Sequence, residues 1–303
     1  IGMLPDDVRS ALMATTAETS GGVLVYDAPI AEETSDVVLD VGRRPQAWVG
    51  GGTRVWLNAD PARLVARDEL EAVLEAVRAH SSGFGSDNRA GLDGQLHRIS
   101  RVRDRTDTVD TGLTIRFGRA VTGTADILAD ILLGTDKSVL LLGEPGSGKT
   151  TLLRDVARML AAESNVAVVD TSSEIAGDGS VAHDCIGLAR RFQVPSLDRQ
   201  ADKMIEVVQN HTPHIMVIDE IGRTKEVAAA KTTKQRGVRC VASAHGDLRK
   251  LVKNAQLNGL VGGVESVTVG DMMAAKHGGR KTLAERAAAP TFDVIAMMRR
   301  GAH

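Results

Sequence analysis

Aromatic residues and cysteines are both scarce in this sequence of 303 residues. Phe, Tyr and Trp make up 2% of the residues, which argues against a surface of aromatic rings on which nucleic-acid bases stack. The two cysteines, Cys185 and Cys240, stand far apart and form no Cys-x-x-Cys pair, which excludes a disulfide framework and an ordinary zinc site. We therefore expect a reducing compartment.

The sequence also lacks long apolar runs and an excess of one charge. No apolar run approaches the roughly 18 residues that crossing a bilayer requires, so we expect no transmembrane segment. Lys and Arg number 37 against 39 Asp and Glu, a formal charge of −2. This balance excludes a polybasic coat over the whole protein but leaves room for a local basic surface. Because the sequence starts at Ile1 without a Met, we expect it to be part of a longer protein.

The first 122 residues predict a small α+β domain. Hydrophobic residues, 43% of the chain, are numerous enough for a buried core, and four of them recur on one face of a helix near residue 74. We expect the domains to be residues 1–122 and 123–303. The expected helices of the first domain are residues 3–20 and 64–78, and its expected strands are residues 37–41, 46–49, 53–57, 96–103 and 113–117.

From residue 123 onward helical and strand-like segments alternate, which indicates an α/β fold with a parallel sheet covered by helices. A closing hairpin of residues 282–286 and 292–298 is expected at the end. The basic stretch Lys276–Lys281 before it is interpreted as a solvated loop, with contact to phosphate or nucleic acid as the alternative. The expected strands are residues 138–142, 166–170, 215–219, 238–243 and 264–269, and the expected helices are residues 149–162, 202–210 and 225–234.

The strongest motif is a phosphate-binding loop of the form G-x-x-x-x-G-K-[ST]. An apolar strand precedes it and a helix follows, and this context disfavours a chance match in a glycine-rich chain. Glycines let backbone N–H groups surround a phosphate, and the helix N-terminus adds its dipole. Lys149 is expected to reach the β- and γ-phosphates, and the hydroxyl of Thr150 to bind Mg²⁺. The expected nucleotide-binding residues are Gly143, Glu144, Pro145, Gly146, Ser147, Gly148, Lys149, Thr150 and Thr151.

Two acids, Asp219 and Glu220, follow another apolar strand. A parallel strand delivers both to the carboxyl edge of the sheet, where ligands bind in such folds. We expect Asp219 to hold Mg²⁺ through water and Glu220 to orient or deprotonate the attacking water. The alternative is an ordinary strand end with solvated acids, and the phosphate loop elsewhere in the chain disfavours it.

Two further strand ends carry candidate catalytic residues. Glu174 follows the strand at residues 166–170 and is either a second carboxylate that positions water or metal, or a loop carboxylate without a chemical role. His245 follows the strand at residues 238–243 and is expected to sense the γ-phosphate through a hydrogen bond, with a structural histidine as the alternative.

These four pieces, in this order, resemble the secretion-type branch of the RecA-like ATPases, which has a phosphate loop, an acidic box, an Asp-Glu strand and a histidine box. The sequence is more similar still to the family of stage III sporulation protein AA and its cyanobacterial and plastid relatives. This similarity implies a RecA-like P-loop NTPase core with a small N-terminal α+β domain. It covers nearly the whole chain, including residues 38–45, 87–91, 96–103, 118–123, 170–178, 187–191 and 261–271.

The resemblance implies an ATPase that requires Mg²⁺ and works as a homo-oligomeric ring, with a hexamer as the expected form. In such a ring, an arginine of one subunit reaches the γ-phosphate that its neighbour binds. An arginine-rich hairpin offers candidates, with a solvated hairpin of weak ion pairs as the alternative, and Arg190 and Arg191 are further candidates. The hairpin arginines are Arg98, Arg101, Arg103, Arg105, Arg116 and Arg119.

The sequence leaves open what such a motor acts on. The secretion-type resemblance implies a peripheral motor on a membrane complex, for protein export or differentiation. The alternatives are a nucleic-acid-associated ATPase and a nucleotide-gated scaffold with little turnover. Relatives often carry a single-strand-binding module with an Arg-x-x-x-His signature, but none follows the ATPase part here, so nucleic-acid binding is not transferred from it. The plastid and cyanobacterial likeness favours the plastid stroma or a bacterial cytoplasm.

Overall fold

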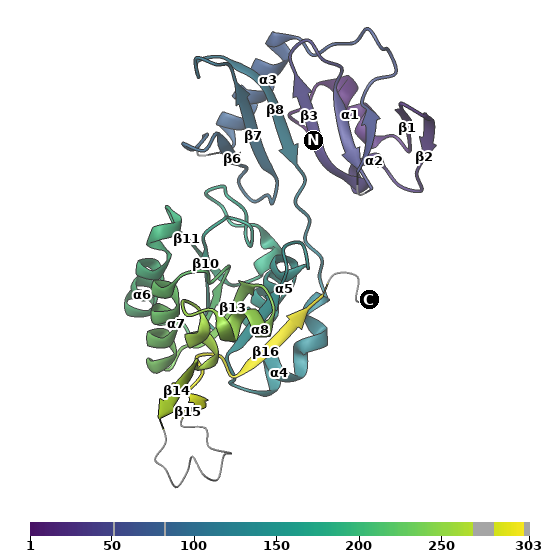
Figure 1. Cartoon of the computed structure of the whole chain (residues 1–303). Helices are drawn as coiled ribbons and strands as arrows, with labels where there is room; N and C mark the ends of the chain where they lie inside the picture. Colours follow the sequence, from purple (N-terminus) through teal and green to yellow (C-terminus); the bar gives the residue numbers. More distant parts are fainter. Residues whose placement is uncertain (51, 82, 269–281, 300–303) are drawn as a thin grey trace. The chain divides into compact units, whose positions relative to one another are not determined.

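The computed structural model describes residues 1–50, 52–81, 83–268 and 282–299, which form two compact units (Figure 1). The first unit comprises Ile1–Ala120 and the short segment Gly177–His183, and the second comprises Val121–Ala176 and Asp184–His303. Within the first unit, the carboxylate of Asp93 accepts the N–H of Val181 at 3.3 Å, which ties the short segment to that unit. The division into domains at residue 122 stays a prediction.

The first unit is built on an eight-stranded antiparallel sheet with the strand order β2-β1-β5-β4-β3-β8-β7-β6. Alternate residues of its strands, such as Val37 and Leu39, are buried, and the helices close over them through one hydrophobic cluster. The elements are α1 (Asp6–Met13), β1 (Thr16–Thr19), β2 (Gly22–Val25), α2 (Ile30–Glu33), β3 (Thr34–Asp40), β4 (Gln46–Val49), β5 (Thr53–Trp56), α3 (Arg67–Ala79), β6 (Arg89–Gly91), β7 (Arg98–Arg103) and β8 (Asp110–Arg116).

The beginning of the chain differs from the sequence-based prediction. The helix expected over residues 3–20 is wrong beyond Met13, because the chain turns instead into the hairpin of β1 and β2. The β-branched Thr15 and Thr16 favour extended backbone, and the left-handed φ of Gly22, +128°, suits a tight turn. The three-residue strand β6 was not predicted either, because so short a segment carries no periodicity.

The second unit is a six-stranded parallel sheet with the order β11-β10-β12-β13-β9-β16. The strands at its centre are apolar on both faces, which a parallel sheet covered by helices requires. The elements are α4 (Ala129–Gly134), β9 (Val139–Gly143), α5 (Lys149–Ala161), β10 (Val166–Asp170), β11 (Arg190–Gln193), α6 (Gln200–His211), β12 (Ile215–Ile218), α7 (Thr224–Gln235), β13 (Arg239–His245), α8 (Leu248–Lys253), β14 (Val264–Thr268), β15 (Thr282–Arg286) and β16 (Val294–Met298), with short 3₁₀ turns at Thr124–Leu128, Asp184–Ile186, Leu197–Arg199 and Asn258–Val261.

Helices cover both faces of this sheet, with α6 and α7 on one side and α5 on the other (Figure 1). Leu140 and Leu142 of β9 belong to the cluster that includes the α6 and α7 side chains. Since side chains alternate along a strand, the equally buried Leu141 points to the α5 side. None of the helices in the described part of the chain has the length and apolar character needed to cross a bilayer.

The end of the chain also differs from the prediction. The expected closing hairpin of residues 282–286 and 292–298 is wrong, because β15 pairs with β14 and β16 lies parallel to β9. The apolar residues of β16 extend the central sheet beside a fully buried neighbour, which stabilises them more than a solvent-exposed hairpin does. Val269 and the predicted Lys276–Lys281 loop lie outside the described residues, and α4 and β11 were not predicted.

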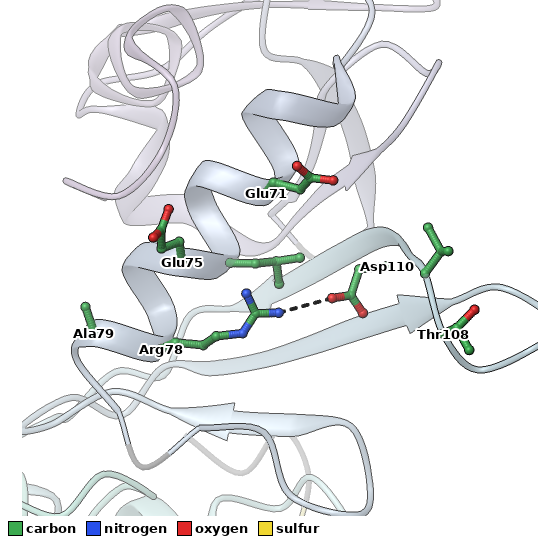
Figure 2. A pocket seen from close by; sticks show the side chains of 8 residues that line it. Glu71, Glu75, Arg78, Ala79, Thr108 and Asp110 are labelled. Atoms are coloured by element: carbon green, nitrogen blue, oxygen red, sulfur yellow. Dashed lines mark hydrogen bonds and ion pairs between the residues drawn. The ribbon is translucent and has the colours of Figure 1, made fainter.

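A hollow of about 830 Å³ lies between α3 and the turn that joins β7 to β8 (Figure 2). Arg78 of α3 approaches Asp110 across it, with Nη2 3.3 Å from Oδ2. Arg103 and Arg101 lie 3.4 and 3.9 Å from the other carboxylate oxygen. Three guanidinium groups therefore share one carboxylate, whose side chain is 13% exposed.

Asp110→Asn should lower the free energy of unfolding by about 2–4 kcal/mol, because three guanidinium groups lose a largely buried counterion. The measurement is urea unfolding followed by a signal from the first unit. Asp107→Asn in the same turn is the matched control. Its side chain is 71% exposed and lies 3.2 Å from Arg103, so it should cost at most about 1 kcal/mol. Equal losses in the two variants would contradict this account.

Candidate functional site

Four strand ends of the second unit meet at one edge of the parallel sheet. β9 ends at Gly143 and is in register with His245 at the end of β13. β10 ends at Asp170 and lies beside β12, which is followed directly by Asp219. Because the strands are parallel, the residues that follow them are carried to the same edge, where open α/β sheets bind ligands.

The loop from Gly143 to Thr150 turns tightly between β9 and α5. Gly146 and Gly148 have φ of +73° and +89°, the left-handed region that glycine tolerates best. A Cβ on Gly143 would lie 2.6 Å from the hydroxyl of Ser147 and 2.9 Å from the carbonyl of Met298, so no larger residue fits there. The sequence therefore folds locally into a closed loop with N–H groups at the start of a helix.

Lys149 is buried at the centre of this loop, and its Nζ donates to the carbonyls of Gly143 at 2.8 Å and Glu144 at 3.0 Å. Burial lowers the pKa of Lys149, and the carboxylates of Glu220, Glu144 and Asp219 oppose that effect.

The loop has room for a further hydrogen bond. The buried hydroxyl of Ser147 has no partner within the described residues. A buried ammonium group, an unsatisfied hydroxyl and glycine backbone are the donors that a nucleotide phosphate takes, so these residues fit such a ligand.

The residues expected to bind magnesium lie among hydroxyl groups and carboxylates. Thr150 Oγ1 lies 3.5 Å from Glu174 Oε2, and the hydroxyl of Ser172 donates to the carboxylate of Asp219. Among the described residues, no three His, Cys, Asp or Glu side chains form a ready metal cluster.

Asp219 and Asp170 are two neighbouring buried acids. Burial, and then the negative charge of Asp170, raise the pKa of Asp219 to about 7, although the Ser172 hydroxyl works in the opposite direction. Burial also raises the pKa of Asp170, while the N–H groups of Ala176 and Ile175 oppose the rise. A cation at this position would stabilise the ionised form of Asp219.

Glu220 and His245 lie side by side at the same edge. His245 Nδ1 is 3.3 Å from Glu220 Oε1, and both side chains are about half exposed. The buried amide of Gln200 donates to the carbonyl of Glu220 at 2.7 Å, which fixes the backbone of that residue. The structure thus brings a carboxylate and an imidazole together beside the phosphate loop, both able to reach solvent.

The residues proposed from the sequence meet in one place, and several neighbours were missed. The phosphate loop, Glu174, Asp219, Glu220 and His245 all lie at this edge. The missed residues act through backbone atoms or single contacts that leave no motif. They are Arg154, Asp170, Ser172, Gln200, Ser243, which donates to the carbonyl of Asp219, and Lys250, whose Nζ lies 3.1 Å from Glu144.

The hairpin arginines lie in the first unit, and most have partners there. Arg105, at the exposed turn between β7 and β8, makes no hydrogen bond or ion pair with any residue that the structure describes. Arg98 is not free, because it has at least one polar, electrostatic or ring contact with another residue. The two other candidates, Arg190 and Arg191, lie on β11 of the second unit. Intrachain hydrogen bonds or ion pairs hold Arg101, Arg103, Arg116 and Arg119.

The chain resembles known proteins over most of its length. A model of the family described as "Sporulation stage III, protein AA" matches residues 85–268, more than half of the chain. The chain is 48% identical over 270 residues to protein SEEDLING PLASTID DEVELOPMENT 1 of Arabidopsis thaliana, covering 88% of this chain and 38% of that protein. It is 46% identical over 262 residues to ycf45 of Porphyra purpurea, covering 86% and 45%. The chain therefore spans less than half the length of these curated relatives.

Among solved structures, the pilus retraction motor PilT with bound ADP matches with a TM-score of 0.57. The match covers 84% of this chain and 79% of that chain at 15% identity, so it speaks for the fold alone. The expected α/β fold with a RecA-like parallel sheet is confirmed, and so is the expected family resemblance.

Asp219→Asn should raise the free energy of unfolding by about 4 kcal/mol at about pH 8 and change it little at about pH 4. The pKa of Asp219 is about 7 in the native state, against 3.8 in the unfolded state. Between these two pH values the native state binds more protons than the unfolded state, so the contribution of Asp219 to the free energy of unfolding falls as the pH rises from 3.8 to 7. The measurement is urea unfolding without nucleotide or metal.

Asp155→Asn is the control with the opposite sign. Burial alone would raise the pKa of Asp155, but bonds from Ala125 and Arg158 lower it, so this variant should lose stability at neutral pH. A gain for Asp219→Asn that ignores pH would contradict the assignment.

Proposed function

We propose that this chain, which belongs to the family of sporulation stage III protein AA, binds ATP with Mg²⁺ and hydrolyses it as a motor ATPase. The observation that carries the proposal is the closed phosphate loop, with Lys149 buried at its centre, at the same sheet edge as three carboxylates. A phosphate loop alone supports nucleotide binding, whereas acids at the neighbouring strand ends supply what hydrolysis requires. ATP is preferred over GTP because the sequence carries no guanine-reading motif.

Each residue at the edge then has a chemical role. Lys149 and the loop N–H groups bind the β- and γ-phosphates and offset the charge that grows on them during transfer. Thr150 and Asp219 would hold Mg²⁺, which neutralises phosphate charge when it is bound. Glu220 orients the attacking water and accepts its proton, because its carboxylate is half exposed and lies beside His245. His245 senses the γ-phosphate through a hydrogen bond.

The proposed active form is a ring, with a hexamer as the expected size. An arginine from a neighbouring subunit would neutralise charge on the γ-phosphate, an effect that is worth roughly 10³ to 10⁵ in rate in other phosphate-transferring systems. Arg105 is the best candidate, because its side chain is exposed and makes no hydrogen bond or ion pair within the described part of the chain. Hydrolysis would then depend on assembly.

The work of this motor is also a proposal, since the chain spans only part of its relatives. One relative is named for seedling plastid development and one structural neighbour is a pilus retraction motor. A peripheral motor on a membrane complex, in the plastid stroma or a bacterial cytoplasm, agrees with both names. Binding to nucleic acid gains no support from the hairpin, because ion pairs and hydrogen bonds within the chain hold most of its arginines.

Lys149→Ala should abolish ATP binding and turnover, while Glu220→Gln should keep binding and lose at least about 10²-fold in turnover, because only the attacking water loses its base. Turnover is measured against protein concentration, with particle mass read by light scattering. Lys203→Ala, on the surface of α6, is the control and should behave as the wild type. Unchanged turnover in Glu220→Gln would favour a nucleotide-gated scaffold over a motor.

Arg105→Ala should lower turnover by about 10³-fold at concentrations where the ring forms, without changing nucleotide affinity. Mixing Arg105→Ala with Lys149→Ala should restore part of the activity, because a site between them combines an intact loop with an intact arginine. Arg116→Ala is the hairpin control, since Arg116 Nε already pairs with Asp36 at 3.0 Å. Lack of recovery in the mixture, with mixed rings present, would rule out Arg105 as the residue that acts in trans.

A further inference from the structure

The backbone of Glu174, Ile175 and Ala176 is held by its N–H groups on one side. The carboxylate of Asp170 accepts all three of them, from Glu174 at 3.1 Å on Oδ1 and from Ile175 and Ala176 at 3.2 and 2.9 Å on Oδ2. Asp170 is fully buried. A buried carboxylate with three backbone donors fixes the path of the chain more firmly than any one of those bonds.

The same short segment is held by its carbonyl groups on the other side. Arg154 of α5 donates to the carbonyl of Glu174 through Nε at 3.0 Å and Nη2 at 2.5 Å, and through Nε to the carbonyl of Ile175 at 3.1 Å. Nε reaches both carbonyls and Nη2 adds a second bond to the carbonyl of Glu174, so the planar guanidinium group holds the two carbonyls in one fixed geometry. Asp170 therefore binds the N–H groups of this segment, while Arg154 binds its carbonyl groups.

Arg154 also lies one helical turn after Thr150, so that both residues share a face of α5. Thr150 Oγ1 is 3.5 Å from Glu174 Oε2, and Arg154 fixes the backbone of that same glutamate. One helix face thus carries the expected magnesium ligand and the anchor of the carboxylate that contacts it.

From this geometry we propose that Asp170 and Arg154 are positioning residues, which hold Glu174 where its carboxylate orients the Thr150 hydroxyl toward magnesium. The inference rests on the proposed function and names the part of the site that sets its metal dependence. A hydroxyl that donates its proton to Glu174 keeps its lone pairs for a cation. Mutating a group that orients a metal ligand usually lowers metal affinity or activity by roughly 10- to 100-fold. For Asp170 and Arg154 we expect the lower end of this range, about 10-fold.

The test uses the affinity of a fluorescent, non-hydrolysable ATP analogue, measured once with Mg²⁺ and once with EDTA. Asp170→Asn and Arg154→Met should each reduce the gain in affinity that Mg²⁺ gives by about 10-fold, and leave the affinity in EDTA within about twofold. Arg154→Lys, which keeps the charge but not the fork, should lose nearly as much and guards against misfolding of Arg154→Met. In a Glu174→Gln background, neither change should reduce the magnesium gain further.

The same helix supplies a matched control pair. Asp155 is also buried, accepts the N–H of Ala125 at 2.8 Å and the Nε of Arg158 at 2.7 Å, and makes no hydrogen bond to the Glu174 segment within the described residues. Asp155→Asn and Arg158→Met should therefore lower thermal stability and keep the magnesium gain of the wild type. Amide exchange of residues 174–176 should accelerate in Asp170→Asn and stay slow in Asp155→Asn.

The outcomes separate this inference from the proposed function. If the wild type gains affinity from Mg²⁺ and Asp170→Asn and Arg154→Lys keep that gain, the positioning role is wrong and the proposed function stands. Equal losses with Mg²⁺ and with EDTA, or full losses in the Glu174→Gln background, would also overturn it. If the wild type binds the analogue under neither condition, the proposed function fails, and the inference fails with it.

Discussion

Asp170 and Asp219 are buried side by side at the ends of neighbouring strands, and the cost of burying two carboxylates governs the rest of the edge. The two acids meet this cost in different ways. Asp170 accepts three backbone N–H groups, whereas Asp219 receives the hydroxyl of Ser172 and keeps a pKa raised to about 7. Asp170 therefore fixes the backbone of the neighbouring loop, whereas the ionised form of Asp219 would be stabilised by a bound cation.

The parallel sheet is what allows this arrangement. Strands that are apolar on both faces are covered by helices, and only their carboxyl ends remain open to polar chemistry. Gly143 must be a glycine because the loop closes against Ser147 and the carbonyl of Met298 on β16. Strand β16, the last in the sequence, thus supports the phosphate loop that follows its neighbour β9, although the two strands lie far apart in the sequence.

The central strands and the phosphate loop could be predicted because local residues determine them. Each buried strand is a short apolar run, and the loop motif requires its glycines and lysine in fixed positions. The pairing of the final strand and the β1–β2 hairpin could not, because pairing partners depend on the rest of the fold. Nor could the contacts of Arg154 and Asp170, since both bind backbone atoms, which any sequence supplies.

Helix α5 connects the phosphate loop to the segment that carries Glu174. Its first residues, Lys149 and Thr150, belong to the phosphate loop, and Arg154, one turn later, holds the carbonyls of the Glu174 segment. Asp170 of β10 holds the same segment through its N–H groups, so the helix and the sheet together fix the backbone of Glu174. The contact between the Thr150 hydroxyl and the Glu174 carboxylate therefore depends on α5 and β10 keeping their relative position, which the packing between them maintains. One short segment thus links the start of α5 to the strand ends that carry Asp170 and Asp219.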